Sequence, residues 1–290
     1  MFTAYNGDCC QELSKVESDS VGYTIFSPPF SSLYTYSDSP NDFGNCRNND
    51  EFFEHMDFLI PELMRVTMPG RCLSFHCMNL PSSKARDGFI GLKDFRGMLI
   101  AAFQKSGWIF HSEVCIWKDP VTAMQRTKAI GLLYKQLKKD SCISRQGIPD
   151  YLVTMRKPGE NKKPVKKEPQ YSEVHPYGMH VNEWQEYASP VWMDINPSKT
   201  LQSMREERDE RHICPLQLEV IERGIRLWSM PNDLVLSPFM GIGSEGYVAL
   251  KMERDFVGIE LKKAYYDQAL KNLERAELEA KQQSLFSEAK

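Results

Sequence analysis

The stretch VLSPFMGIGSEGYVALKMERDFVGIEL (residues 235–261) predicts a strand, a glycine turn, a helix and a second strand. Gly241, Gly243 and Gly246 have G-x-G-x-x-G spacing, and Glu260 ends the second strand 19 residues after Gly241. Such glycines allow a tight turn and close approach of the backbone to a ligand, and the acid can accept hydrogen bonds from ribose hydroxyls. The pattern therefore predicts a nucleotide-type cofactor, and it fits NAD, FAD or S-adenosylmethionine equally.

The position of this unit predicts the order of the strands. Only 44 residues follow Gly246, which leaves room for one strand and one helix. Since a dinucleotide site needs a second βαβ half, that half must lie upstream. We expect a circularly permuted sheet whose first two strands come last in the chain, with TAYNGD (3–8) as its third strand.

Hydrophobic patterning upstream predicts strands that alternate with helices, which is typical of a mostly parallel sheet covered on both faces. Pro61 predicts a kink or a break in the helix around residues 52–63. A charged helix is expected from about residue 264. The other predicted strands are VGYTIF (21–26), RCLSFHC (71–77), IFHSEVCIW (109–117) and PDYLVTMRK (149–157), and the other predicted helices cover 95–107 and 218–228.

Composition limits the class of protein. A chain of 290 residues can bury a full α/β core and add a smaller insert. It has no run of 18 apolar residues and no signal-peptide pattern at its start, so we expect a cytoplasmic protein. The eight cysteines form no CxxC pair and are expected to be free thiols. His76 with Cys72 and Cys77 fits a strand better than a metal cluster, so no metal is expected.

Charge is unevenly distributed along the chain. The net charge is −3, yet residues 118–168 hold 13 Lys or Arg against 5 Asp or Glu. Such a basic stretch is either a solvated face or a surface that follows phosphates.

The 20 residues at 31–50, of which 12 are Ser, Asn, Asp or Gly, predict a long loop after a strand.

The tetrapeptide Ser27-Pro28-Pro29-Phe30 follows the predicted strand 21–26. In open α/β sheets, chemistry takes place at the carboxyl ends of the strands. Two prolines remove N–H donors, so the carbonyl of Pro28 and the hydroxyl of Ser27 can accept hydrogen bonds from an amino group. Phe30 adds an aromatic face. A plain Pro-Pro turn that leaves a strand is the alternative.

The order of Asp8, SPPF, a long insert, SPF-x-GIGS and GIE resembles the amino-methylating DNA methyltransferases of the permuted, β arrangement. The resemblance covers nearly the whole chain. It implies a Rossmann-like S-adenosylmethionine-dependent methyltransferase fold with a mostly parallel seven-stranded sheet. Ser237 departs from the pattern, because the family usually has Asp there. The resemblance implies catalytic roles for Ser27, Pro28, Pro29 and Phe30, and cofactor contacts from Asp8, Cys9, Ser237, Phe239, Gly241, Gly243, Ser244 and Glu260.

The resemblance also implies a division of the chain and a DNA surface. Residues 1–157 and 206–290 would form the catalytic and cofactor-binding halves, and 158–205 the target-recognition insert. Double-stranded DNA would be the partner, with the target base flipped out of the helix. The expected DNA contacts are Lys162, Lys163, Lys166 and Lys167 to phosphates, and Trp184 and Trp192 to bases; the two tryptophans could instead be the core of the insert.

The resemblance leaves the target base open. Ser27 favours cytosine N4, since the adenine N6 enzymes mostly carry Asp or Asn before the two prolines. Methylation of RNA or protein, and a DNA-binding relic without activity, remain alternatives; Ser237 is the feature that favours the relic. Family resemblance implies a homodimer, whereas the sequence gives neither the recognition site nor whether a partner restriction enzyme exists.

Overall fold

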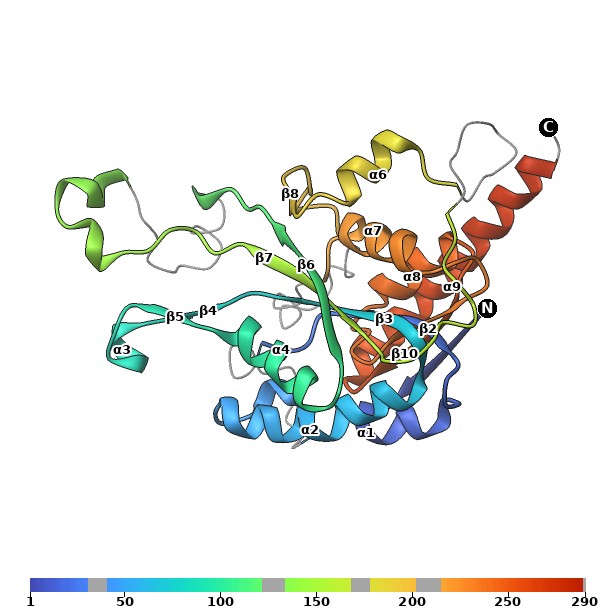
Figure 1. Cartoon of the computed structure of the whole chain (residues 1–290), viewed down its shortest axis with the longest axis horizontal. Coiled ribbons are helices and arrows are strands. Elements are labelled where there is room, and N and C mark those ends of the chain that lie inside the picture. The colour runs from blue at the N-terminus through green and yellow to red at the C-terminus, as the bar shows by residue number, and fades with distance from the viewer. Residues whose placement is uncertain (31–40, 122–133, 168–177, 202–214, 289–290) are drawn as a thin grey trace.

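A computed structural model describes residues 1–30, 41–121, 134–167, 178–201 and 215–288. An eight-stranded sheet forms the middle of three layers (Figure 1). Its spatial order is β1 (Phe2–Asn6), β10 (Asp255–Glu260), β9 (Leu234–Ser237), β2 (Val21–Phe26), β3 (Thr67–Cys77), β7 (Asp150–Arg156), β6 (Ile109–Ile116) and β8 (Val191–Trp192).

The pairing of the strands confirms the predicted permutation. The first strand of the chain, β1, pairs in parallel with β10, and β10 pairs in parallel with β9, which pairs in parallel with β2. The glycine unit at the end of the chain therefore fills the centre of the sheet. Among the strands described, only β7 is antiparallel to both of its neighbours, β3 and β6. The sheet is thus mostly parallel, and the ends of β1, β10, β9, β2, β3 and β6 lie at one edge.

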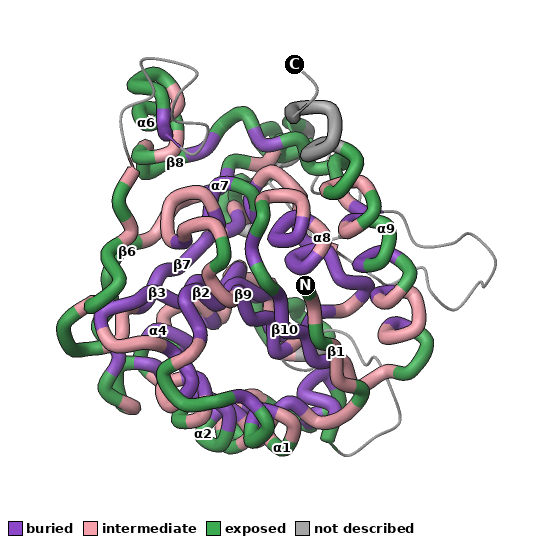
Figure 2. Tube along the Cα trace, turned by 90° about the vertical axis from the view of Figure 1, so that its right-hand side faces the viewer, coloured by how far each residue is buried: buried purple, intermediate pink, exposed green. Residues whose placement is uncertain are grey.

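Helices cover both faces of the sheet (Figure 2). On one face lie α1 (Cys9–Glu12), α2 (Asn49–Val66) and α4 (Phe95–Lys105), and on the other lie α7 (Leu218–Trp228), α8 (Ser244–Lys251) and α9 (Lys263–Glu288). The shorter elements are α3 (Lys84–Asp87), α6 (Val181–Tyr187), β4 (Leu80–Ser82), β5 (Gly91–Lys93) and the 3-10 turns η1 (Leu13–Lys15), η3 (Phe43–Asn45), η4 (Tyr134–Lys138) and η5 (Ser141–Ile143).

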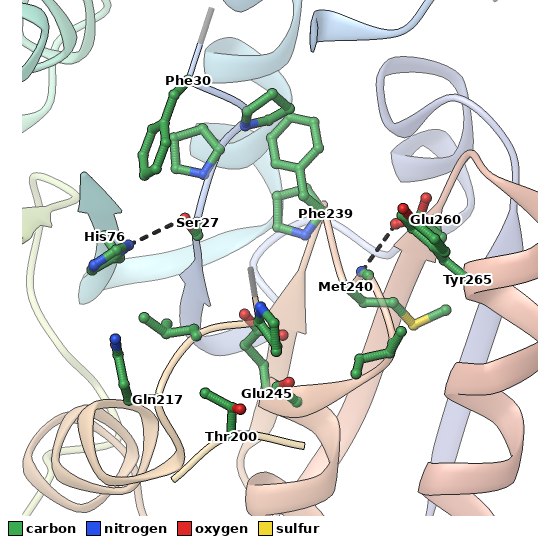
Figure 3. Close-up of a pocket in the computed structure, with 18 of the residues that line it drawn as sticks. Ser27, Phe30, His76, Thr200, Gln217, Phe239, Met240, Glu245, Glu260 and Tyr265 are labelled. Carbon is green, nitrogen blue, oxygen red and sulfur yellow. Dashed lines mark hydrogen bonds between the residues drawn. The ribbon is translucent and has the colours of Figure 1, made fainter. Parts of the chain in front are cut away.

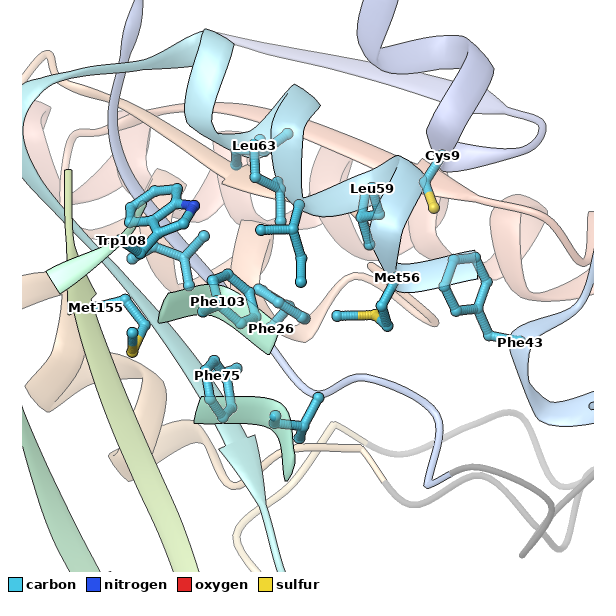
Figure 4. Packing of buried hydrophobic residues seen from close by; sticks show 14 of the residues in the cluster. Cys9, Phe26, Phe43, Met56, Leu59, Leu63, Phe75, Phe103, Trp108 and Met155 are labelled. Carbon is cyan, nitrogen blue, oxygen red and sulfur yellow. The ribbon is translucent and has the colours of Figure 1, made fainter. Parts of the chain in front are cut away.

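Helix α2 buries one face against the sheet. The side chain of Asn48 accepts a hydrogen bond from the N–H of Glu51 and caps its start. Its apolar residues recur at helical spacing and pack against the aromatic rings of the strands (Figure 4). The helix continues through Pro61, so the predicted break is absent. Pro61 and Asp57, whose carbonyl lacks its usual donor, both face solvent, where water can satisfy that carbonyl.

On the opposite face of the sheet, α8 packs so closely against α9 and β10 that residue 246 is a glycine. A Cβ at Gly246 in α8 would lie 2.4 Å from Leu273 Cδ2 in α9 and 2.5 Å from Phe256 Cδ1 in β10. These distances are too short for any side chain, so Gly246 serves helix packing rather than a ligand. The close contact fixes the position of α8 relative to β10.

Two expectations need correction or comment. The sheet has eight strands rather than seven, because Val191 and Trp192 of the predicted insert add β8 beside β6.

The seven cysteines in the described part are free, as expected, whereas Cys214 lies outside it. No helix within the described ranges is both long and apolar enough to cross a bilayer.

Candidate active site

A cavity of about 650 Å³ opens at the edge where the parallel strands end (Figure 3). Segments that follow β1, β2, β9 and β10 form most of its wall. The catalytic and cofactor candidates that the structure brings together here are Ser27, Pro28, Pro29 and Phe30 with Asp8, Cys9, Phe239, Gly241, Ser244 and Glu260. The two constellations predicted from distant parts of the sequence thus share one cavity.

The glycine turn is tied to Glu260. Gly241 and Gly243 have φ angles of +53° and +86°, in the left-handed region that favours glycine. The N–H of Gly241 donates to Oε2 of Glu260 at 2.9 Å, and the N–H of Lys262 donates to Oε1 at 2.8 Å. Burial nevertheless raises the pKa of Glu260 to about 7. This carboxyl is therefore held in place and titrates near neutral pH.

Two of the predicted cofactor residues lie behind the cavity. Gly243 is absent from the lining, and a Cβ there would lie 3.3 Å from Cβ of Ala269, so its role is close packing against α9. Ser237 is fully buried at the end of β9, and its hydroxyl has no hydrogen-bond partner within the described ranges. The structure thus places Ser237 and Gly243 outside the cavity lining, and their cofactor contacts stay a prediction.

Ser27 begins a chain of polar side chains. Its Oγ lies 3.2 Å from Nδ1 of His76, and Nε2 of His76 lies 3.0 Å from Oδ2 of Asp150, an ion-pair distance. The same oxygen of Asp150 receives Lys118 Nζ at 2.5 Å. Burial alone would raise the pKa of the Asp150 carboxyl, but His76 and Lys118 together hold it below its ordinary value. An ionised Asp150 favours hydrogen on Nε2 of His76, which leaves Nδ1 free to accept from Ser27.

Aromatic rings form the wall beside Ser27. The ring of Phe30 lies 6.2 Å from His76 and 6.3 Å, edge to face, from Phe95. The ring of Phe239 lies 5.2 Å, edge to face, from Phe43. Such spacings are typical of stable aromatic packing. Part of the cavity therefore has flat apolar walls on which a planar group could stack.

Sequence reasoning missed several residues of the cavity. Asp42 and Phe43 come from the far end of the predicted loop, and His76 and Asp150 come from two strands that pair antiparallel. Glu245 lies in the first turn of α8 and is 4% exposed. Polar residues at predicted strand ends were the available signal for His76 and Asp150. No signal in the sequence indicated that Glu245 lines a site, because a glutamate in the first turn of a helix is common at helix starts.

The lysines predicted to contact DNA lie at the edge of the sheet away from the cavity. The carbonyl of Lys163 accepts from buried Arg71, near the start of β3, whereas His76 lies near its end. His76 comes five residues after Arg71 along the strand, a rise of about 16 Å. Figure 1 shows the chain end marked N at the same side as this lysine segment. Lys162, Lys163 and Lys166 therefore lie away from the cavity, and their contacts with DNA stay a prediction.

Two further DNA candidates have structural roles. Lys167 Nζ donates to the carbonyl of Ser229 at 2.6 Å, and burial lowers its pKa to about 8. Trp192 is 1% exposed, and the guanidinium of Arg223 lies 5.0 Å from its ring. Both residues attach the segment predicted to be an insert to the rest of the fold. Trp184 in α6 is 54% exposed and is the one of the two tryptophans that remains accessible.

One group of possible metal ligands lies at this edge. The ligand atoms of Asp8, Cys9 and Cys10 are within 4.8 Å of one another. The carboxylate of Asp8 already accepts from the N–H of Cys10 and caps α1. A hydrogen bond with Cys10 and burial raise the pKa of Cys9 well above its ordinary value, which disfavours the thiolate that a metal requires.

Comparison with known proteins identifies the family. A family model described as DNA methylase, of the N6/N4 type, matches residues 21–271. The type II methyltransferase M1.MboII of Moraxella bovis is 48% identical over 58 residues, which are 20% of this chain and 22% of that protein. The type II methyltransferase M.BglII of Bacillus subtilis is 25% identical over 267 residues, which are 91% of this chain and 66% of that protein. The matches thus span less than two thirds of both relatives.

A solved structure shares the fold. The protein is from Thermus thermophilus, is described as a DNA modification methylase and was crystallised with S-adenosyl-L-methionine. It superposes with a TM-score of 0.68 at 20% identity, and the match covers 96% of each chain. The arrangement of strands and helices is therefore common to both chains.

Proposed function

The chain belongs to the N6/N4 DNA methylase family, whose members depend on S-adenosylmethionine, and we propose that it methylates the exocyclic amine of a base flipped out of duplex DNA. The proposal rests chiefly on the shared cavity, in which SPPF faces the glycine turn and Glu260. Cytosine N4 is the proposed target atom. Duplex DNA is the proposed substrate, and the cytoplasm is the proposed location of the protein. The homodimer stays a prediction.

The cavity residues fit the cofactor. Six carboxylates line the cavity against two lysines, which suits a ligand that carries a sulfonium and an ammonium group. Glu260 would accept from the ribose hydroxyls, since each of its oxygens uses one lone pair for the backbone. The buried hydroxyl of Ser244 lines the cavity and has no partner in the described part of the chain. When bound, S-adenosylmethionine supplies an electrophilic methyl group.

Ser27 and Pro28 would hold the target amine. The Ser27 hydroxyl donates toward Nδ1 of His76, so its lone pairs point elsewhere and can accept an N–H of the base. Pro28 offers a carbonyl with no competing backbone donor of its own. Phe30 would stack on the base and exclude water. Positioning of this kind accounts for most of the acceleration expected for an in-line transfer.

His76 gives the amine proton a destination. An exocyclic amine that gains a methyl group becomes cationic and must lose a proton to end neutral. The proton can pass to the Ser27 oxygen as the Ser27 proton moves to Nδ1 of His76, and ionised Asp150 stabilises the imidazolium that results. Lys118 keeps Asp150 ionised. The protein therefore needs no strong base in direct contact with the DNA.

The product distinguishes the two bases. After incubation with S-adenosylmethionine and mixed-sequence duplex DNA, nucleoside digestion and mass spectrometry are expected to yield N4-methylcytosine. A neutral hydroxyl at Ser27 supports this preference, since the family's adenine enzymes mostly carry an acid or amide there. Detection of N6-methyladenine would keep the mechanism and reject the base. Methylation of RNA or protein alone would reject duplex DNA.

The connection between β6 and β7 is the proposed DNA surface. It leaves the sheet at Ile116 and returns at Asp150, at the cavity edge, and Trp117 and Lys118 line the cavity. Residues 134–143 stand out from the body of the fold at this edge (Figure 1). From the insert, the segment 178–201 contributes Ile195, Pro197, Ser198 and Thr200 to the lining. We propose that these two segments, rather than 158–167, recognise the target.

Charge reversal at two pairs of lysines tests this orientation. Lys138 and Lys139 are exposed on the β6–β7 connection, and Lys162 and Lys163 are exposed at the opposite edge. Lys138→Glu with Lys139→Glu is expected to weaken duplex binding at least about tenfold and to reduce its salt dependence. Lys162→Glu with Lys163→Glu, the matched control, is expected to change affinity less than about twofold. Fluorescence anisotropy at several salt concentrations measures both, and equal losses would contradict the orientation.

A further inference from the structure

Glu245 is a buried carboxylate without a cationic partner. It is 4% exposed and lines the cavity from the first turn of α8 (Figure 3). No lysine, arginine or histidine of the described residues forms an ion pair with it. Burying an unpaired carboxylate is costly, so a protein normally pairs it or leaves it solvated. The described part of the chain therefore supplies no counter-ion for Glu245.

The surroundings of Glu245 account for its raised pKa. Burial raises its pKa to about 8, and the nearby carboxylate of Glu260 adds to the rise. Its own backbone N–H, at the start of α8, opposes the rise but does not cancel it. The other charged or titratable side chains that line the cavity are Asp8, Cys9, Asp42, His76, Lys118, Asp119, Asp150, Lys262 and Tyr265.

Glu245 and Glu260 lie at the two ends of the glycine turn. Glu260 binds the N–H of Gly241, where the turn begins, and Glu245 follows Gly243 and Ser244, where it ends. Gly246 packs closely against Leu273 and Phe256, which fixes the backbone of Glu245 at the cavity. A ligand whose ribose meets Glu260 and whose chain follows the turn would bring its far end to Glu245.

We propose that Glu245 binds the ammonium group of the methionine part of S-adenosylmethionine. The inference rests on the proposed function, because it assigns a residue to the cofactor of that same cavity. An ammonium group would give the buried carboxylate its missing partner and up to three donors. Ser237, where the family usually has Asp, offers only a buried hydroxyl, so the anion comes from the helix instead of the strand.

Calorimetry with two ligands tests the assignment. The ligands are S-adenosylhomocysteine and its desamino analogue, which lacks only the ammonium group. Glu245→Gln is expected to weaken the first by about 10- to 30-fold, because the charge-assisted bond is lost, and the second by less than about twofold. Glu279→Gln is the matched control, since Glu279 accepts from Tyr247 outside the cavity. Equal weakening of both ligands would mean that Glu245 only supports the fold and would overturn the inference.

Proton release gives a second readout that needs no variant. At pH 6.5 a carboxyl with a pKa of about 8 is protonated, and it must ionise to bind an ammonium group that is itself still charged. The wild-type protein is expected to release up to about one more proton with S-adenosylhomocysteine than with the desamino analogue, measured in buffers of different ionisation enthalpy. Equal release would overturn the inference but leave the proposed function standing. Failure of both ligands to bind would overturn both proposals.

Discussion

Replacing Ser27 with alanine is expected to lower the rate of methyl transfer about 10²- to 10³-fold while the affinity for S-adenosylhomocysteine stays within about twofold. The loss is that expected when one group that positions the reacting atom and accepts its proton is removed. Cofactor affinity is spared because Glu260 and the glycine turn do not contact Ser27. Single-turnover kinetics with saturating DNA and calorimetry measure the two quantities.

Ser74→Ala is the control for this experiment. Ser74 lies on β3, is buried and hydrogen-bonds Thr154 Oγ1 at 2.8 Å, outside the cavity. Its replacement is expected to cost stability but to leave the rate nearly unchanged. His76→Gln should lower the rate, because the proton acceptor is lost. A Ser27→Ala enzyme as fast as the wild type would show that the hydroxyl does not hold the amine.

The sheet was predictable because the glycine unit constrains it from both sides. Too few residues follow Gly246 to complete the fold, so TAYNGD had to join the last strand, and β1 pairs with β10 accordingly. The eighth strand could not be predicted, since it has two residues and its partner, β6, is distant in sequence. Pro61 shows a similar limit: the sequence did not reveal that Pro61 and the Asp57 carbonyl it leaves unpaired would face solvent, where the helix continues.

The site was predictable where one segment carries the chemistry. SPPF and the glycine turn are each continuous in sequence, and both line the cavity. His76 and Asp150 meet only through the antiparallel pairing of β3 with β7, which their positions in sequence do not reveal. The position of the lysines at 162–167 could not be predicted from the sequence for a related reason. A count of charges does not say at which edge of the sheet a segment lies, and Lys163 lies beside Arg71 at the edge away from the cavity.

Glu260→Ala is expected to weaken S-adenosylhomocysteine binding by about 100-fold or more. Two hydrogen bonds from ribose hydroxyls to a charged group would be lost, at roughly 1.5–3 kcal/mol each. The N–H groups of Gly241 and Lys262 would also lose their acceptor, so the glycine turn would loosen. Glu279→Ala, which removes a glutamate outside the cavity, is expected to leave affinity unchanged. Calorimetry gives the affinities, and thermal melting by circular dichroism verifies that each variant is folded.

The pH dependence of binding separates Glu260 from Glu245. Glu260 has a pKa of about 7, so its ionised form, which accepts ribose hydroxyls best, is lost as the pH falls through 7. The affinity of the wild-type protein for the desamino analogue should therefore fall on acidification below about pH 7, since this ligand has no ammonium group for Glu245. Glu260→Ala should abolish that decline, whereas Glu245→Gln should retain it. A decline that survives in Glu260→Ala would assign the titration, and with it the ribose contact, to another carboxylate of the cavity.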